Sequence, residues 1–194
     1  IQAVRVGGST TIQDYNLNTS LQHQFSNKVF STFRVYYTRY NSLQLLSEEK
    51  TGNPFYEDEF NQQFLRFENQ TDISLGENHK VVAGGGFVGE YLNTTRYEGR
   101  RSNTIGYAFA QHEWNIRPNL SVVSGLRFDG NEVYASRLSP KLAVRYNPSA
   151  RLKLMASYGA GFKAPDFRQL YLSFINNASG GYALFGANEL NTER

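Results

Sequence analysis

Hydrophobic and polar residues alternate along most of this chain. In residues 29–39 the odd positions carry, in order, Val29, Ser31, Phe33, Val35 and Tyr37. The same two-residue period returns in residues 17–25, 63–75, 120–128, 138–146 and 151–158. This period predicts β-strands with two chemically different faces. No segment carries the apolar stripe of an amphipathic helix, so we expect an all-β protein with very little helix.

The connections between the predicted strands alternate in length. Short polar turns are predicted at residues 26–27, 76–79, 117–119 and 147–150, and longer connections at 41–60, 93–103, 129–136 and after Lys163. Strict alternation is typical of an outer-membrane barrel, in which turns are short on the periplasmic side and loops are long outside. A soluble sandwich would mix loop lengths more freely at its two ends. The predicted strands, about 9 to 15 residues long, also suit tilted membrane strands.

Aromatic residues gather near the ends of the predicted strands. Beside the short turns stand Phe25, Phe30, Trp114 and Tyr146, and at the far ends Tyr37, Tyr40, Tyr91, Phe128 and Tyr158. Two aromatic girdles at the two membrane–water interfaces would give this distribution. The alternative is the general preference of aromatic residues for strands.

Composition narrows the class of protein to which the chain can belong. The chain has 194 residues, of which 13 are Tyr, 14 are Phe and none is Cys, so disorder and a disulfide scaffold are excluded. The net charge of +3 is too small to indicate nucleic-acid binding. No window approaches eighteen consecutive apolar residues, which excludes a helical membrane span. Without a signal peptide or a closing element, we expect the chain to be a piece of a longer protein.

Two glycine-rich stretches match dinucleotide-binding patterns by letter only. Residues 84–89 read GGGFVG and residues 159–164 read GAGFKA. That motif requires a helix immediately after the glycines, and strand-like sequence or Pro165 follows instead. We therefore interpret these glycines as sites of bending or close packing within a strand.

Few residues suggest catalysis or metal binding. The three histidines, His23, His79 and His112, share no local ligand spacing, and no catalytic triad is apparent. The acidic pair Glu48-Glu49 and the run 57–59 could bind a hard cation such as calcium or form a solvated acidic loop. We favour the loop and expect no metal, no cofactor and no enzyme activity; a barrel-shaped lipase is the distant alternative.

A cluster of basic and aromatic residues falls in one predicted loop. It contains Arg96, Tyr97, Arg100 and Arg101. Guanidinium groups beside an aromatic ring suit an anionic or aromatic ligand. They could also contact lipopolysaccharide phosphates or only solvate the loop tip.

Residues 155–172, MASYGAGFKAPDFRQLYL, resemble TonB-dependent outer-membrane receptors. The matching motif positions are Phe162, Lys163, Ala164, Pro165, Gln169, Leu170 and Tyr171, followed by Asn188 and Leu190 in a weaker match. Residues 107–114 and 124–129 also fit this family. We expect residues 162–171 to fold back against the barrel wall or into the lumen, because Pro165 stops strand pairing and Phe167 and Leu170 are apolar anchors.

The resemblance implies a fragment of a barrel of about 22 strands. Residues 1–194 would be part of the barrel domain, without the N-terminal plug and the C-terminal strands. The family takes up ferric siderophores, haem or cobalamin across the Gram-negative outer membrane, with energy relayed through TonB and the plug. The implied partners are thus a nutrient ligand, TonB and outer-membrane lipid. The alternative from another class is a soluble β-sandwich that binds a ligand such as a carbohydrate.

Overall fold

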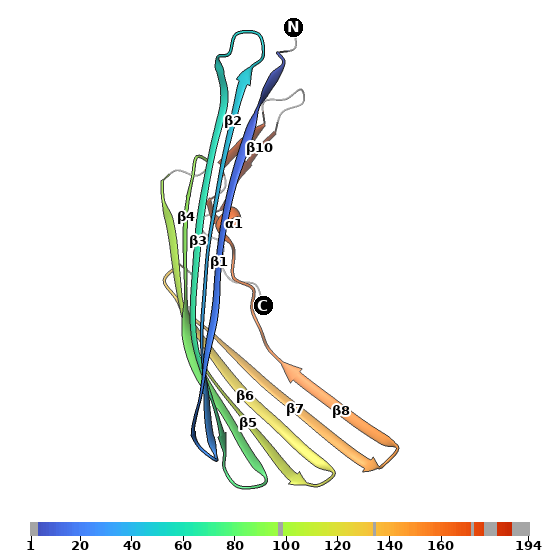
Figure 1. Cartoon of the computed structure of the whole chain (residues 1–194). Coiled ribbons are helices and arrows are strands. Elements are labelled where there is room, and N and C mark those ends of the chain that lie inside the picture. The colour runs from blue at the N-terminus through green and yellow to red at the C-terminus, as the bar shows by residue number, and fades with distance from the viewer. Residues whose placement is uncertain (1–3, 97–98, 134, 172, 177–181, 188–194) are drawn as a thin grey trace.

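Eight antiparallel strands in chain order form one twisted and bent sheet (Figure 1). The structure, a computed structural model, describes residues 4–96, 99–133, 135–171, 173–176 and 182–187. The strands are β1 (Val6–Ser26), β2 (Val29–Glu48), β3 (Pro54–Ser74), β4 (His79–Thr94), β5 (Arg101–Arg117), β6 (Leu120–Asn131), β7 (Arg137–Ser149) and β8 (Leu152–Gly159). The predicted all-β, antiparallel fold is confirmed. The described strands form one open sheet with a separate two-stranded hairpin, not two stacked sheets, so the sandwich alternative is wrong.

Connections of two lengths alternate along the sheet, as predicted. At one end lie the tight turns at residues 27–28, 75–78, 118–119 and 150–151. At the other end lie the connections at residues 49–53, 95–100 and 132–136, and the chain that leaves β8. The tight turns define the end that faces the periplasm in a membrane barrel.

The predicted long loop at residues 41–60 is wrong. There β2 and β3 continue as a paired hairpin, and β1 pairs with β2 from Val6 opposite Glu48 onward. The acidic residues 57–59 are accordingly part of β3 and not of a loop. Serine, asparagine and glutamine populate both faces here, so the chain pairs through its backbone without an alternating hydrophobic signal. Because the strands continue through this polar segment, β1 to β3 are 20 or 21 residues long, which is longer than predicted.

The two faces of the sheet differ in chemistry. Residues that lie directly opposite one another in an antiparallel pair share a face. On β6 and β7 the convex face carries Val122, Leu126, Leu138 and Leu142, and the large side chains of this face remain exposed, Leu126 and Leu142 each at 48%. An apolar face that nothing in the described chain covers is the surface that a bilayer would cover.

The concave face is predominantly polar. On β1 this face carries Asp14, Asn16, Asn18, Ser20, Gln22 and Gln24 beyond Ile12, and on β7 it includes Ser139, Lys141 and Arg145. Apolar residues outside and polar residues inside is the pattern of a membrane barrel whose lumen contains water or protein.

Most of the residues predicted for the aromatic girdles lie on the convex face, and two do not. Trp114 and Tyr146 lie on the convex face near the tight turns, Phe128 and Tyr158 on the same face near the other end, and Tyr37 on this face in the middle of β2. Phe30 and Tyr40 occupy even positions of β2 and therefore lie on the concave face. The face of each residue depends on the register, and Tyr40 also lies inside β2 and not at its end.

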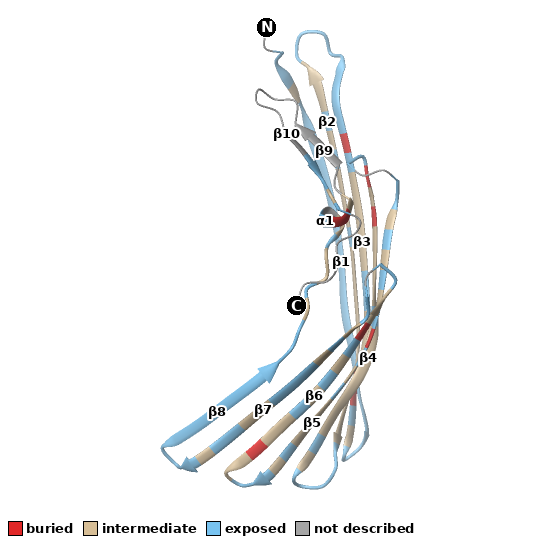
Figure 2. Ribbon diagram, turned by 180° about the vertical axis from the view of Figure 1, so that it is seen from behind, coloured by how far each residue is buried: buried red, intermediate tan, exposed pale blue. Residues whose placement is uncertain are grey.

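The chain after β8 turns back into the bend of the sheet (Figure 1). It forms the short helix α1 (Phe167–Tyr171) and the hairpin β9 (Ser173–Asn176) with β10 (Tyr182–Phe185). Figure 2 shows α1 on the concave side of the sheet, with one buried residue. That residue is Leu170, which is 4% exposed. The expected return of residues 162–171 toward the barrel wall is therefore what the structure has.

Candidate ligand-binding site

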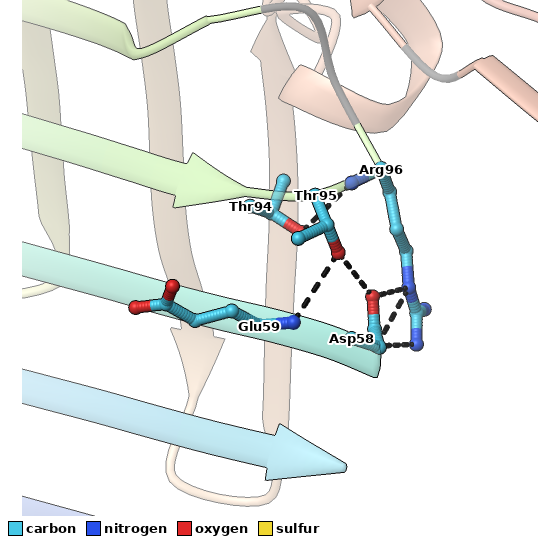
Figure 3. Close-up of polar contacts among 5 residues, drawn as sticks. All are labelled: Asp58, Glu59, Thr94, Thr95 and Arg96. Carbon is cyan, nitrogen blue, oxygen red and sulfur yellow. Dashed lines mark hydrogen bonds and ion pairs between the residues drawn. The ribbon is translucent and has the colours of Figure 1, made fainter. Parts of the chain in front are cut away.

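The connection between β4 and β5 is fastened to β3 by a polar cluster (Figure 3). Arg96 donates from Nε to both carboxylate oxygens of Asp58 at 3.0 Å, and Nη2 forms an ion pair with the same carboxylate. Thr95 donates its hydroxyl to Asp58 at 2.8 Å and its amide to the carbonyl of Glu59 at 3.0 Å. Asp58 is 4% exposed, so it is satisfied by these two partners and not by solvent. This cluster holds the start of the connection in one conformation.

The Asp58–Arg96 pair shifts both titrations. The hydrogen bond from Arg96 holds the pKa of Asp58 below its ordinary value of 3.8, although burial acts in the opposite direction. The hydrogen bond to Asp58 likewise raises the pKa of Arg96. Both groups are therefore ionised at neutral pH, and Arg96 is committed to a partner within the chain.

Helix α1 begins with a reciprocal capping arrangement. The amide of Gln169 donates to the Asp166 carboxylate at 2.8 Å, and the amide of Asp166 donates to the side-chain oxygen of Gln169 at 3.0 Å. This is a capping box, and its Asp-x-x-Gln spacing is visible in the sequence. The far end of the helix is also fixed, because Ala187 donates to the carbonyl of Gln169 at 2.9 Å. A Cβ atom on Gly186 would overlap the backbone of Leu170, so only glycine permits this approach.

Helix α1 is joined to the sheet by Arg101. The guanidinium carbon of Arg101 lies 4.5 Å from the centre of the Tyr171 ring, at a cation–π distance. Leu92 stands opposite Arg101 on β4 and is 2% exposed, the most buried apolar side chain described. Nε of Arg101 is buried and has no hydrogen-bond partner among the described residues. An unsatisfied donor on a charged group can donate a hydrogen bond to an anionic ligand.

The structure separates the predicted ligand-binding cluster. Arg96 turns to β3, Arg101 belongs to β5 and turns to α1, and Arg100 is exposed between them. Tyr97 lies outside the described residues. The loop prediction for Arg101 is wrong, because β4–β5 pairing already begins at this residue, opposite Leu92.

The family-motif residues mostly lie together on the returning segment. Lys163 is exposed, Phe162, Ala164 and Pro165 are half-buried, and Gln169, Leu170 and Tyr171 form the helix. Asn188 and Leu190 lie outside the described residues. In this structure the motif places helix α1, with its buried Leu170, against the concave face.

Lower on the concave face, a polar network crosses several strands. The ring of Tyr107 on β5 lies over Gly86 on β4, and its hydroxyl donates to Glu68 on β3 at 2.7 Å. Arg34 on β2 donates to the same carboxylate at 2.9 Å. The Arg127 guanidinium stacks 4.0 Å from the centre of the Tyr107 ring. The crossing is possible because Gly86 has no side chain, which supports the packing interpretation of this glycine-rich stretch.

Sequence reasoning missed one histidine pair. Nδ1 of His79 and Nε2 of His112 lie 3.0 Å apart on the convex face, and Trp114 stacks on His79 at 5.6 Å. The pair lies across neighbouring strands, so only the β4–β5 register could have predicted it. No group of three or more possible metal ligands occurs among the described residues.

Sequence reasoning also missed that four aromatic residues gather on the concave face of β2 and β3. Tyr36 packs edge-on against Phe64 at 5.7 Å, and Tyr40 against Phe60 at 6.0 Å. The even positions of both strands share the face that carries Leu92, Arg101 and helix α1. The aromatic pairs and α1 therefore line one region of the concave face, at the end away from the tight turns.

These features define the class of the protein. An antiparallel sheet that is apolar outside and polar inside, with alternating turns and loops and a segment folded into its bend, is part of a membrane-spanning barrel wall. In the described part of the chain, no helix is long and apolar enough to cross a membrane.

Comparison with known proteins names the family. Residues 4–194 match the model described as "TonB dependent receptor-like, beta-barrel". The chain belongs to this family. It is 37% identical over 71 residues to the vitamin B12 transporter BtuB of Vibrio cholerae, an alignment that covers 37% of this chain and 11% of the relative. It is 29% identical over 119 residues to the BtuB of Photobacterium profundum, which covers 55% of this chain and 19% of that protein.

Solved structures support the same fold. The siderophore receptor PirA of Pseudomonas aeruginosa superposes with a TM-score of 0.65 at 16% identity, over 93% of this chain and 41% of PirA. A chain of the RagAB peptide importer gives a TM-score of 0.70 at 12% identity, over 96% of this chain and 27% of its own. The chain thus spans less than half the length of each of these relatives, and it matches part of a larger barrel.

Proposed function

We propose that the protein is an outer-membrane receptor that takes up a scarce nutrient, namely a ferric siderophore, cobalamin or haem. The observation that carries the proposal is the opposite chemistry of the two faces. An exposed apolar face suits contact with lipid, and a polar concave face suits a lumen through which a hydrophilic ligand passes. The similarity to the BtuB proteins favours cobalamin as the first ligand to test, and the fold shared with PirA favours siderophores.

Residues 1–194 would form part of the barrel domain, and TonB would act through a plug domain outside this chain. The polar concave face supports this arrangement, because a lumen-filling domain needs hydrogen-bonding partners along the wall. Transport would follow the usual logic of differential affinity: a ligand bound tightly in one state is released when energy favours another state.

The ligand would first meet the connections at the end away from the tight turns. Arg100 and Arg101 are the basic residues here that make no ion pair among the described residues, so we propose that they attract an anionic ligand. Replacing both with alanine in the intact receptor should weaken binding of such a ligand about 30-fold, since each of the two charge-assisted contacts contributes roughly 1 kcal/mol. Unchanged affinity would remove these two residues from the binding site.

Growth of a deletion strain tests the function directly. Cells that lack the receptor are supplied with cobalamin, one ferric siderophore at a time, or haem as the limiting source. Growth lost on one source and restored by the intact gene would support the proposal and name the nutrient. Growth unchanged on every source would contradict it.

A further inference from the structure

The concave face carries four aromatic rings where its neighbours are polar. The rings are those of Tyr36, Tyr40, Phe60 and Phe64, which we call the aromatic ladder. They form two edge-to-face pairs, each between a tyrosine on β2 and the phenylalanine diagonally across from it on β3, and each ring is half-buried. On the adjoining strand the same face carries amides and a carboxylate, from Asp14, Asn16 and Asn18. In a water-filled lumen such rings remain partly hydrated unless a ligand or a protein covers them.

Arg66 adds a positive charge to the ladder. It stands opposite Tyr36 on the same face, and its guanidinium carbon lies 5.4 Å from the centre of the Phe64 ring. Arg66 is exposed and makes no ion pair among the described residues. The nearest carboxylate along its strand, Glu68, is occupied by Arg34 and Tyr107. The charge of Arg66 is therefore available to a ligand.

Helix α1 borders the ladder on its other side. Tyr40, Gln62, Leu92 and Arg101 stand on one rung of four neighbouring strands, and Tyr171 packs on Arg101. With strands about 4.8 Å apart, Tyr40 and Arg101 are roughly 14 Å from each other. A ligand of more than one ring would fill this width, with an arginine at each side.

From these contacts we infer that the aromatic ladder and Arg66 bind an anionic ligand that carries aryl groups. This inference rests on the proposed function and narrows its ligand class. Aryl rings stack on Tyr40 and Phe60 or insert between the pairs, Arg66 and Arg101 balance the negative charge, and the amides Asn16 and Gln62 bond to hydroxyl or carbonyl groups. A ferric complex of catecholates has this chemistry, whereas ferric citrate has the charge without the rings.

The test uses the purified full-length receptor in detergent, with ferric dihydroxybenzoate as the aryl probe and ferric citrate as the matched anion without rings. Affinities are measured by titration calorimetry. The double variant Tyr40→Leu/Phe60→Leu removes rings but keeps apolar volume, and Arg66→Gln removes the charge. Tyr37→Leu and Arg39→Gln are matched controls, because both residues lie on the convex face of β2, which also carries Tyr40 on its concave face.

We expect the wild-type receptor to prefer ferric dihydroxybenzoate over ferric citrate. The double variant should lose about 10-fold in affinity for the aryl probe and Arg66→Gln about 5-fold, while both controls stay within about 2-fold. Thermal unfolding of each variant shows whether the barrel is intact, and the comparison uses variants that unfold like the wild type. If the double variant and Arg66→Gln both misfold, the single substitution Tyr40→Leu replaces them, with an expected loss of about 3-fold in affinity for the aryl probe.

Two results would overturn the inference: equal affinity for the two probes, or losses no larger than those of the controls. Neither result touches the proposed function, which the deletion strain tests separately. A receptor that restores growth on ferric citrate or cobalamin but ignores the aryl probe would keep its transport function and lose this ligand class.

Discussion

Gly86 lies where Tyr107 crosses from β5 to β3, so alanine at this position should destabilise the barrel wall. An added Cβ would overlap the carbonyl oxygen of Phe67 and would stand 3.0 Å from both the Tyr107 hydroxyl oxygen and the Glu68 Cα. Overpacking of this kind costs about 1–3 kcal/mol. Displacing the Tyr107 hydroxyl also removes a hydrogen bond to a carboxylate, which contributes about 1.5–3 kcal/mol. We therefore expect Gly86→Ala to lower the free energy of unfolding by about 2.5–6 kcal/mol.

The same strand offers a matched control. A Cβ on Gly89 would meet no atom within 4 Å, so Gly89→Ala should change the free energy of unfolding by less than about 1 kcal/mol. Tyr107→Phe removes only the hydroxyl and should cost about 1.5–3 kcal/mol. In the Gly86→Ala background it should cost much less, because the hydrogen bond is already lost.

Equilibrium urea unfolding of the intact receptor in lipid vesicles compares the four variants with the wild type. Equal effects of Gly86→Ala and Gly89→Ala would refute the reasoning. Additive costs of Gly86→Ala and Tyr107→Phe would show that the glycine does not serve the crossing.

Two further predictions concern the polar cluster and the convex face. Because Arg96 lowers the pKa of Asp58 in the folded state, the cluster should stabilise the connection above pH 3.8 and lose this effect as the pH falls through the lower, folded-state pKa. Hydrogen exchange at the Thr95 amide, corrected for its intrinsic pH dependence, should accelerate over that range, and Asp58→Asn should accelerate it at pH 7; exchange that ignores both changes would contradict the assigned anchor. On β7, Leu142→Arg should cost about 2–4 kcal/mol in vesicles and Ala143→Arg, on the concave face, under about 1 kcal/mol. Equal costs in the urea assay would contradict the assignment of faces.

The sequence predicts the regular part of this wall and misses what depends on register. The strands of Leu126 and Leu142 could be predicted, because a buried or lipid-covered face needs apolar residues at every second position. The hairpin of residues 41–60 lacks that requirement on both faces, so its polar residues suggested a loop. Tyr40 was placed at a strand end because the limits of its strand were misplaced, and it lies inside β2 on the concave face.

The candidate site shows the same division. The Asp-x-x-Gln spacing of residues 166–169 was available in the sequence and predicts the start of α1. Contacts between residues far apart in the chain were not available, because they need the pairing of neighbouring strands. Tyr107 with Glu68, Arg96 with Asp58 and Arg101 with Tyr171 are contacts of this kind.

The account depends most on which face of the sheet meets lipid. The chain contains no cysteine, so single cysteines can be placed in neighbouring positions of β6 and β7. Spin labels at positions 122, 126 and 142 represent the convex face, and labels at 123, 127 and 143 the concave face. In the intact receptor in lipid vesicles, relaxation by oxygen, which partitions into lipid, and by a water-soluble nickel complex reports the surroundings of each label. We predict strong oxygen relaxation at the first three positions and weak oxygen relaxation at the second three; the reverse pattern, or no alternation between the two sets, would contradict the membrane barrel.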